Sequence, residues 1–177
     1  AQSAEDLLVN AYVYSLGMID ATETRVTNSI TNDNRIELTN SNIKTSTAYR
    51  DITLAAADDL KLYTSAVAET PIGVVAGSNA VVKNALQRTN ALGLYGAGEL
   101  YSMNDISYYA GKHLDGSLGR LELDAQAINY NGGVIPVVLS PSLNNEVTQQ
   151  NELFMQSGAS NSVRHTNIYA DAGEELV

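Results

Sequence analysis

The sequence contains no cysteine and no tryptophan, and it has only two histidines among 177 residues. Without cysteine the chain has no disulfide, no thiolate nucleophile and few ligands for a structural zinc site. Neither His113 nor His165 lies in a motif for a metal site or a catalytic triad, so we interpret both as structural or surface residues. These absences predict a protein without enzymatic activity and without a cofactor.

Basic residues are also scarce. Ten lysines and arginines stand against 20 aspartates and glutamates, which gives a formal net charge of -10. The basic residues are scattered singly along the chain. An acidic chain without a basic cluster repels phosphate backbones and anionic lipid, so we expect no direct binding of nucleic acid.

Long hydrophobic runs are absent as well. The longest, residues 132–139, is far shorter than the roughly 20 residues of a transmembrane helix, so no membrane span is expected. The first residues have no basic region and therefore do not indicate a signal peptide. Either an initiator methionine or a leader preceded Ala1, and the sequence does not choose between a cytoplasmic and a secreted protein.

Composition indicates one globular domain, with 44% hydrophobic and 17% charged residues. We expect a helical domain with a small β element over residues 1–156. The polar residues 157–177 contain few apolar anchors and predict a C-terminal arm, of the kind that a neighbouring subunit orders.

Spacings of three and four residues predict the helices. Apolar and small side chains recur in this way from Leu8 through Ile19 to Val26, and again from Tyr49 through Leu60 to Val67. A third helix is expected after Ser78, a fourth over residues 98–111, and a short one over residues 144–156. The polar tract 27–47 fits either a short strand around Ile36 and Leu38 or a helix that continues through it.

One segment favours β structure. Residues 127–130 and 134–139 flank an Asn-Gly-Gly turn at 131–133, which is typical of a hairpin. Pro136 cannot donate to a strand ladder, so this segment belongs at a sheet edge or in an extended buried segment. The predicted fold is therefore mainly α, a core of about four helices with a small β-hairpin or extended edge element near residues 121–139.

Other patterns carry little chemistry. The glycines at 93, 96 and 98 do not have the spacing of a nucleotide-binding loop. On the expected helix, Asp58 and Asp59 would point apart, which indicates a solvated face. The acidic stretch from Asp115 to Asp124 lacks the spacing of a calcium loop, although a weakly bound calcium ion stays open. His113 with Asp115 is the best remaining candidate for a carboxylate and histidine enzyme site.

Ten tyrosines against one phenylalanine form a skewed aromatic set. Tyrosine combines an apolar ring with a polar tip and suits half-buried positions at interfaces. The alternative is that several tyrosines simply edge the monomer core. The candidate interface residues are Tyr95, Tyr101, Tyr108, Ile168 and Tyr169.

The leading functional hypothesis is a structural subunit that self-assembles into an extracellular filament or a virion-like particle. Its partners are copies of itself and, secondarily, other structural proteins. Many secreted filament and virion proteins share this composition loosely, which is an analogy and not a family assignment. The alternatives are a soluble helical binding or adaptor module acting on a protein partner and, last, the His113 enzyme.

Overall fold

The computed structural model describes residues 2–45, 50–156, 160–163, 168–172 and 175–176, and within these ranges it contains strands and no helix. The first six strands are β1 (Gln2–Tyr14), β2 (Ile19–Thr39), β3 (Asn42–Lys44), β4 (Ile52–Thr70), β5 (Val75–Tyr95) and β6 (Glu99–Ser102). The others are β7 (Ile106–Ala110), β8 (Arg120–Asn131), β9 (Ile135–Val138), β10 (Ser142–Met155), β11 (Ser160–Val163), β12 (Ile168–Ala172) and β13 (Glu175–Leu176).

The chain winds in successive coils that stack on one another. Coil 1 contains β1 to β3, coil 2 contains β4 to β6, coil 3 contains β7 to β11, and β12 and β13 begin a further coil. Every pairing between named strands is parallel: β4 lies between β1 and β8, β5 between β2 and β10, and β6 between β3 and β11. This arrangement is a parallel β-solenoid.

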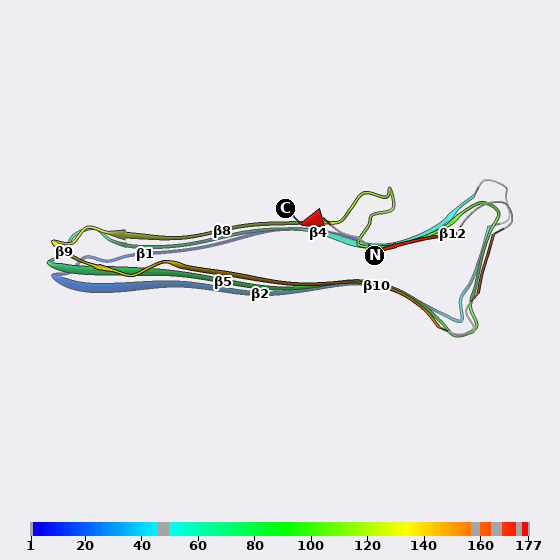
Figure 1. The fold of residues 1–177 in the computed structure, drawn as a ribbon, viewed down its shortest axis with the longest axis horizontal. Helices are drawn as coiled ribbons and strands as arrows, with labels where there is room; N and C mark the ends of the chain where they lie inside the picture. Colours follow the sequence, from blue (N-terminus) through cyan, green and yellow to red (C-terminus); the bar gives the residue numbers. More distant parts are fainter. Residues whose placement is uncertain (1, 46–49, 157–159, 164–167, 173–174, 177) are drawn as a thin grey trace.

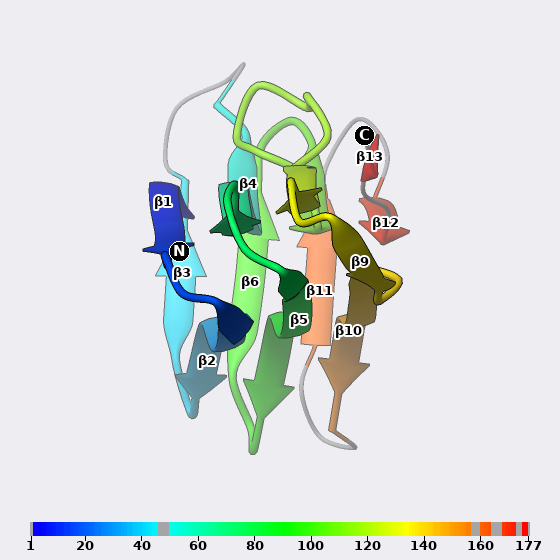
Figure 2. The same cartoon turned by 90° about the vertical axis from the view of Figure 1, so that its left-hand side faces the viewer.

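The cross-section of a coil is long and narrow. Viewed down the shortest axis, the layer of β1, β4 and β8 runs beside the layer of β2, β5 and β10, and the two layers separate at one end where β10 turns away (Figure 1). The view turned by 90° shows strands of successive coils side by side, for example β2, β5 and β10 (Figure 2). The connections 15–18, 71–74 and 132–134 close the narrow end, which we call the tip.

Coil 3 carries an insertion relative to coil 2. Ile52 pairs with Ile106 and Leu60 pairs with Leu121, so the offset between the coils grows from 54 to 61 positions. The loop 111–119 between β7 and β8 accounts for this growth, and it holds an isolated antiparallel bridge between Lys112 and Leu118.

The core is a thin layer between the two long sheets. Along β4 and β5 the side chains alternate, as the extended backbone requires: Leu60, Leu62, Val82 and Leu86 are buried, whereas Lys61 and Lys83 between them are exposed. Near the tip the core is built mainly of alanine and valine, which lets the sheets approach closely. Larger side chains fill the wide end, among them Leu92, Leu100, Ile106 and Tyr108.

The predicted helical core is wrong. The first expected helix lies in β1 and β2, the second in β4, the third in β5, the fourth in β6 and β7, and the short one in β10. Residues three and four apart, which share one face of a helix, include residues on both faces of a strand, so the predicted apolar seam combined inward and outward side chains. Ile19, which the helical spacing placed on the buried face of the first helix, is 82% exposed. Residues 46 and 47 of the tract 27–47 lie outside the described residues. Over residues 27–45 the strand was the better of the two interpretations, although β2, with 21 residues, is far longer than a short strand.

The predicted hairpin is also wrong. Gly132 and Gly133 do lie in a turn, but β8 and β9 pair in parallel with β4 and β5 and not with each other. Among the described strands β9 pairs only with β5, so Pro136 lies at a sheet edge. In the expected C-terminal arm, the described segments β11, β12 and β13 add strands to β6, β7 and β8 of the same chain.

Candidate assembly interface

A column of asparagines runs through the interior of the layer that β2, β5 and β10 form. Asn28 pairs in register with Asn84, and Asn84 with Asn145. The Asn28 amide nitrogen donates to Asn84 Oδ1 at 2.8 Å, and the Asn84 amide nitrogen donates to Asn145 Oδ1 at 2.8 Å. Thr64 of the facing sheet joins the column by donating to Asn84 Oδ1. Each amide therefore satisfies the next, which offsets the cost of its burial.

A second column lies six residues further along the same strands. Asn34, Asn90 and Asn151 are in register, and Asn90 donates to Asn151 Oδ1 at 3.1 Å. Asn84 is 2% exposed and Asn90 fully buried. Buried polar ladders of this kind specify which residues lie opposite one another, because a shifted strand would leave amides unpaired.

A buried ion pair lies between the two columns. Arg88 is fully buried and Asp58 of the facing sheet is 1% exposed. Arg88 Nε donates to Asp58 Oδ2 at 2.9 Å, and its Nη2 lies 2.8 Å from Oδ1 and 3.0 Å from the Asp58 carbonyl oxygen. The Asn32 amide also donates to Asp58 Oδ2. This pair joins the two sheets across the core.

Apolar columns alternate with these polar ones. Ile30, Leu86 and Val147 are in register, as are Ile36, Leu92 and Leu153. Each coil therefore presents the same order of chemical types along its inner face.

Strands at both ends of the stack have one uncovered side. Within the described residues, β1, β2 and β3 pair only toward coil 2, and β9, β10 and β11 pair only toward coil 2 from the opposite side. On β8, strand β13 pairs only with Arg120 and Leu121. The backbone N–H and C=O groups that point away from the stack are ready to pair with a further strand.

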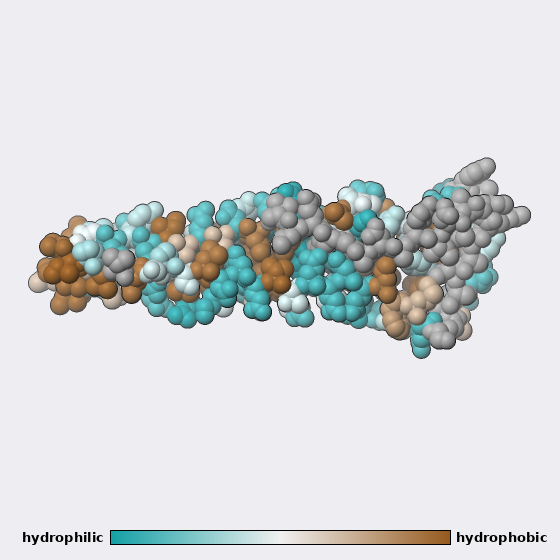
Figure 3. Space-filling view, viewed as in Figure 1, coloured by the Kyte–Doolittle hydropathy of each residue, from teal (hydrophilic) through white to brown (hydrophobic). Residues whose placement is uncertain are grey.

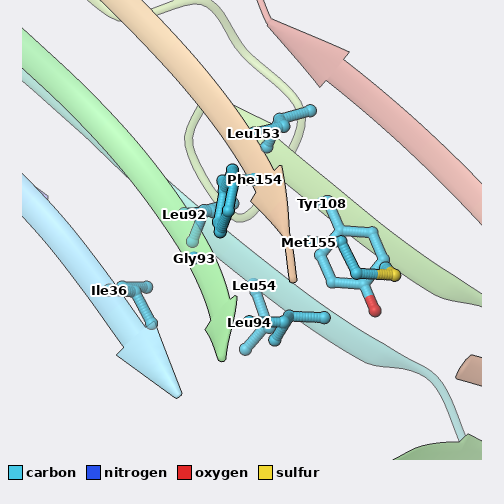
Figure 4. A pocket seen from close by; sticks show the side chains of 9 residues that line it. All are labelled: Ile36, Leu54, Leu92, Gly93, Leu94, Tyr108, Leu153, Phe154 and Met155. Atoms are coloured by element: carbon cyan, nitrogen blue, oxygen red, sulfur yellow. The ribbon is translucent and has the colours of Figure 1, made fainter. Parts of the chain in front are cut away.

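A small cavity lies beneath the uncovered edge at the wide end. It measures about 80 Å³ and is lined by side chains from five strands, among them Ile36 of β2, Leu54 of β4, Leu92 and Leu94 of β5, Tyr108 of β7, and Leu153 and Met155 of β10 (Figure 4). Burial raises the pKa of Tyr108 to about 12. The lining is apolar and offers no catalytic group other than this phenol.

The tip carries an exposed apolar patch. Hydrophobic residues gather at the narrow end of the molecule (Figure 3). The exposed side chains there come from all three tip connections and from the strands that follow them: Leu16, Met18, Ile19, Ile72, Val74, Val134 and Ile135. Contiguous apolar surface of this kind is typical of a contact with another molecule.

The enzyme candidate does not form a catalytic arrangement. His113 Nε2 lies 3.1 Å from Asp59 Oδ1, not against Asp115. The Asp115 carboxylate accepts hydrogen bonds from the hydroxyl and backbone nitrogen of Ser117, which lower its pKa. The serine therefore points to a carboxylate and not to the imidazole, unlike a nucleophile and its base.

The acidic residues were also candidates for a metal site. No group of three or more metal-ligating side chains occurs in the part of the chain that the structure describes. The expected solvated face was wrong for Asp58, because neighbouring residues of a strand face opposite sides: Asp58 points inward to Arg88, and Asp59 accepts from the backbone nitrogen of Arg120 at the surface.

The candidate interface residues lie around the wide end. Tyr95 is half-buried and its ring contacts Phe154, with centroids 5.3 Å apart. Tyr101 donates to Met103 Sδ at 3.4 Å. Tyr108 is 6% exposed and has little surface to offer a partner. Ile168 and Tyr169 belong to β12, whose backbone pairs with Ile106 and Ser107 of β7.

Sequence reasoning missed the asparagine columns and the ion pair. The available signal was the recurrence of asparagine and apolar residues in one order, as in Asn28, Ile30 and Asn34 against Asn84, Leu86 and Asn90.

Comparison of the chain with protein-family models, with curated proteins and with solved structures found no match. Within the described ranges, no helix has the length and apolar character to cross a membrane.

Proposed function

We propose that this chain is a non-enzymatic structural subunit that lengthens into a rod when further copies add coils to its open edges. The observation that carries the proposal is the pair of uncovered, in-register strand edges at opposite ends of one stack. Parallel strand pairing already stacks coil 2 on coil 1 and coil 3 on coil 2. An added copy would stack its coil 1 on coil 3 by the same kind of pairing.

The length of these edges supports the proposal. β1 has 13 residues, β2 has 21 and β10 has 14. Long uncovered strands favour pairing with another chain, and proteins that remain single usually block them with proline, lysine or bulges. β2 contains neither proline nor lysine, and its exposed arginines pair with neighbouring acids of the same strand.

The chemistry of the remaining surface supports a structural role. His113 contacts the half-buried Asp59, the described acidic residues form no metal-binding group, and the cavity at the wide end is apolar. The polar side chains that form ordered hydrogen-bond networks lie inside the coil, where they specify the register of the strands.

Sedimentation velocity over a concentration series, with negative-stain microscopy of the same samples, tests the proposal. We expect species that grow with concentration and rods whose width stays constant while their length increases, because addition occurs only at the ends. A closed dimer or a monomer at every concentration would contradict it.

A binding module is the second candidate, and the apolar tip favours it. The module would be a β-solenoid, not the helical adaptor expected from the sequence. A chain that stays monomeric at every concentration favours this candidate, with Ile72 and Val134 of the tip as the contact residues to replace by serine.

A further inference from the structure

We infer that a second copy of this chain docks its β2 edge on the β10 edge in one register, with its Asn28 on Asn145 and its Asn34 on Asn151. The inference rests on the proposed function and specifies its interface. Within one chain, β2 and β10 lie on opposite sides of β5 and share its register, so the same step repeated once more brings β2 of the next copy onto β10.

The first asparagine column, Asn28, Asn84 and Asn145, has a direction that suits this contact. Asn28 donates to Asn84, and Asn84 donates to Asn145, so the amide donors all point from coil 1 toward coil 3. The column ends at Asn145, whose carbonyl oxygen accepts from Asn84 and whose strand has no neighbour on its other side among the described residues, so the donor of this amide is left for a further partner. The acceptor that the column needs next is an amide carbonyl, and Asn28 of a second copy supplies it.

The apolar columns agree with the same register. Ile30 of the second copy falls on Val147, Ile36 on Leu153, and Leu38 on Met155. Within one chain the same three residues already pair with apolar residues of coil 2. Leu153 and Met155 line the cavity at the wide end, so the second copy covers that cavity with apolar side chains. Burying such side chains is the main favourable contribution to a contact of this kind.

Other registers are penalised. A shift by one residue turns every side chain of β2 to the opposite face. A shift by two places Asn145 against Val26 or Ile30 of the second copy and leaves buried amides without partners.

Charges on the outer face are compatible with the contact. In the inferred register Glu152 lies opposite Arg35 of the second copy, and Glu146 lies opposite Ser29. No like charges meet directly across β10 and β2, whereas such pairs would be destabilising.

The layer of β1, β4 and β8 also continues from one copy to the next in this contact. Leu123 and Ala127 of β8 receive Leu7 and Ala11 of the second copy, the residues already in register with them through β4. Glu122 would face Asp6 there, next to the two residues that β13 covers, so pairing along β8 starts at Leu123.

Engineered cysteines test the register directly, because the chain has none of its own. Thr31 and Thr148 are exposed on the outer face and both pair with Gln87. Within one chain, two strand spacings separate them, roughly 9.6 Å, too far for a disulfide, whereas in the inferred contact they are neighbours at about 4.8 Å. The chain with Thr31→Cys and Thr148→Cys is expected to form a ladder of disulfide-linked oligomers on mild oxidation.

The matched control carries Asp33→Cys with Thr148→Cys and tests a register shifted by two. It is expected to cross-link about tenfold less, because a diagonal pair lies beyond disulfide reach. Rods that cross-link through the control pair, or through neither, overturn the inferred register and leave the proposed function standing. A chain that forms no rods and no cross-links overturns both.

Two isomeric variants test the amide column. Asn145→Asp places a carboxylate against the Asn28 carbonyl of the second copy while Asn84 can still donate to it. Asn144→Asp adds the same charge to the outer face of the same exposed segment. We expect the first to raise the concentration for half-assembly about tenfold or more and the second less than about threefold. Equal effects would overturn the role of the column.

Discussion

At the scale of residues, the interior is held by polar groups as much as by apolar ones. Arg88 is the largest fully buried side chain in the described part of the chain, and its partner Asp58 comes from the opposite sheet. Breaking a buried pair leaves one charge unpaired in a medium that solvates it poorly. The pair therefore makes the two long layers dependent on each other.

We predict that Arg88→Met lowers the free energy of unfolding by about 3 to 5 kcal/mol, because Asp58 stays buried without its cation. The control is Arg25→Met, which breaks an exposed, solvent-screened pair with Glu23 and is expected to leave the free energy of unfolding nearly unchanged. Urea unfolding followed by circular dichroism measures both. Similar losses for the two variants would show that Asp58 is solvated and the layers are not packed as described.

Tyr108 gives a prediction about alkaline pH. Its folded pKa of about 12 exceeds the ordinary value of 10.0, so between these values the folded chain binds a proton that the unfolded chain has lost. Stability contributed by this group is complete below pH 10 and declines as the pH rises toward 12. Tyr108→Phe is expected to flatten the fall in stability over that range. Identical pH profiles for the two chains would show that the phenol is not buried.

At the scale of elements, the turns of the tip stack as closely as the strands do. A Cβ on Gly132 would lie 2.0 Å from the carbonyl oxygen of Pro71, in the turn of the coil above. A Cβ on Gly17 would come no closer than 3.4 Å to any neighbour, an ordinary contact. The glycine of coil 3 is therefore required by the turn beside it.

We predict that Gly132→Ala costs about 1 to 3 kcal/mol, because the turn must move away from Pro71. Gly17→Ala serves as the control and is expected to leave the melting temperature within a few degrees, since the added methyl group fits. Differential scanning calorimetry of both variants provides the comparison. A tolerated alanine at 132 would mean that the turns do not stack.

The strands were hidden in the sequence for a physical reason. Six of the ten inward positions of β2 are polar, Asn28, Asn32 and Asn34 among them, so hydrophobic residues do not alternate with period two. In β4, inward Leu60 and outward Tyr63 together imitate a helical spacing. The abundance of threonine and valine was a usable β signal. Inward asparagines such as Asn28 form hydrogen bonds with asparagines of the next coil, more than 50 residues away in the sequence. A local sequence pattern does not indicate such distant partners.

At the scale of the whole molecule, the sequence did not predict the architecture. The coils were missed because each is more than 50 residues long and the loop 111–119 changes the offset between them. The expected contact residues around Tyr95 lie near the wide end, whereas the proposed interface uses backbone edges and interior amides. Those features exist only once the coils are stacked.

The direction of growth follows from the same architecture. The strands run across the short axis of the molecule, so addition of a copy lengthens the stack by whole strand spacings. Each copy contributes three coils, and we expect an axial repeat of about 14 Å from strands spaced at about 4.8 Å.

Electron cryo-microscopy of the assembled chain tests this most directly. Rods whose strands run perpendicular to the axis, with a spacing near 4.8 Å and a repeat of about 14 Å per copy, are the predicted result. Rods with strands along the axis, lateral contacts through the tip alone, or particles that close at a fixed size would contradict end-to-end stacking of coils.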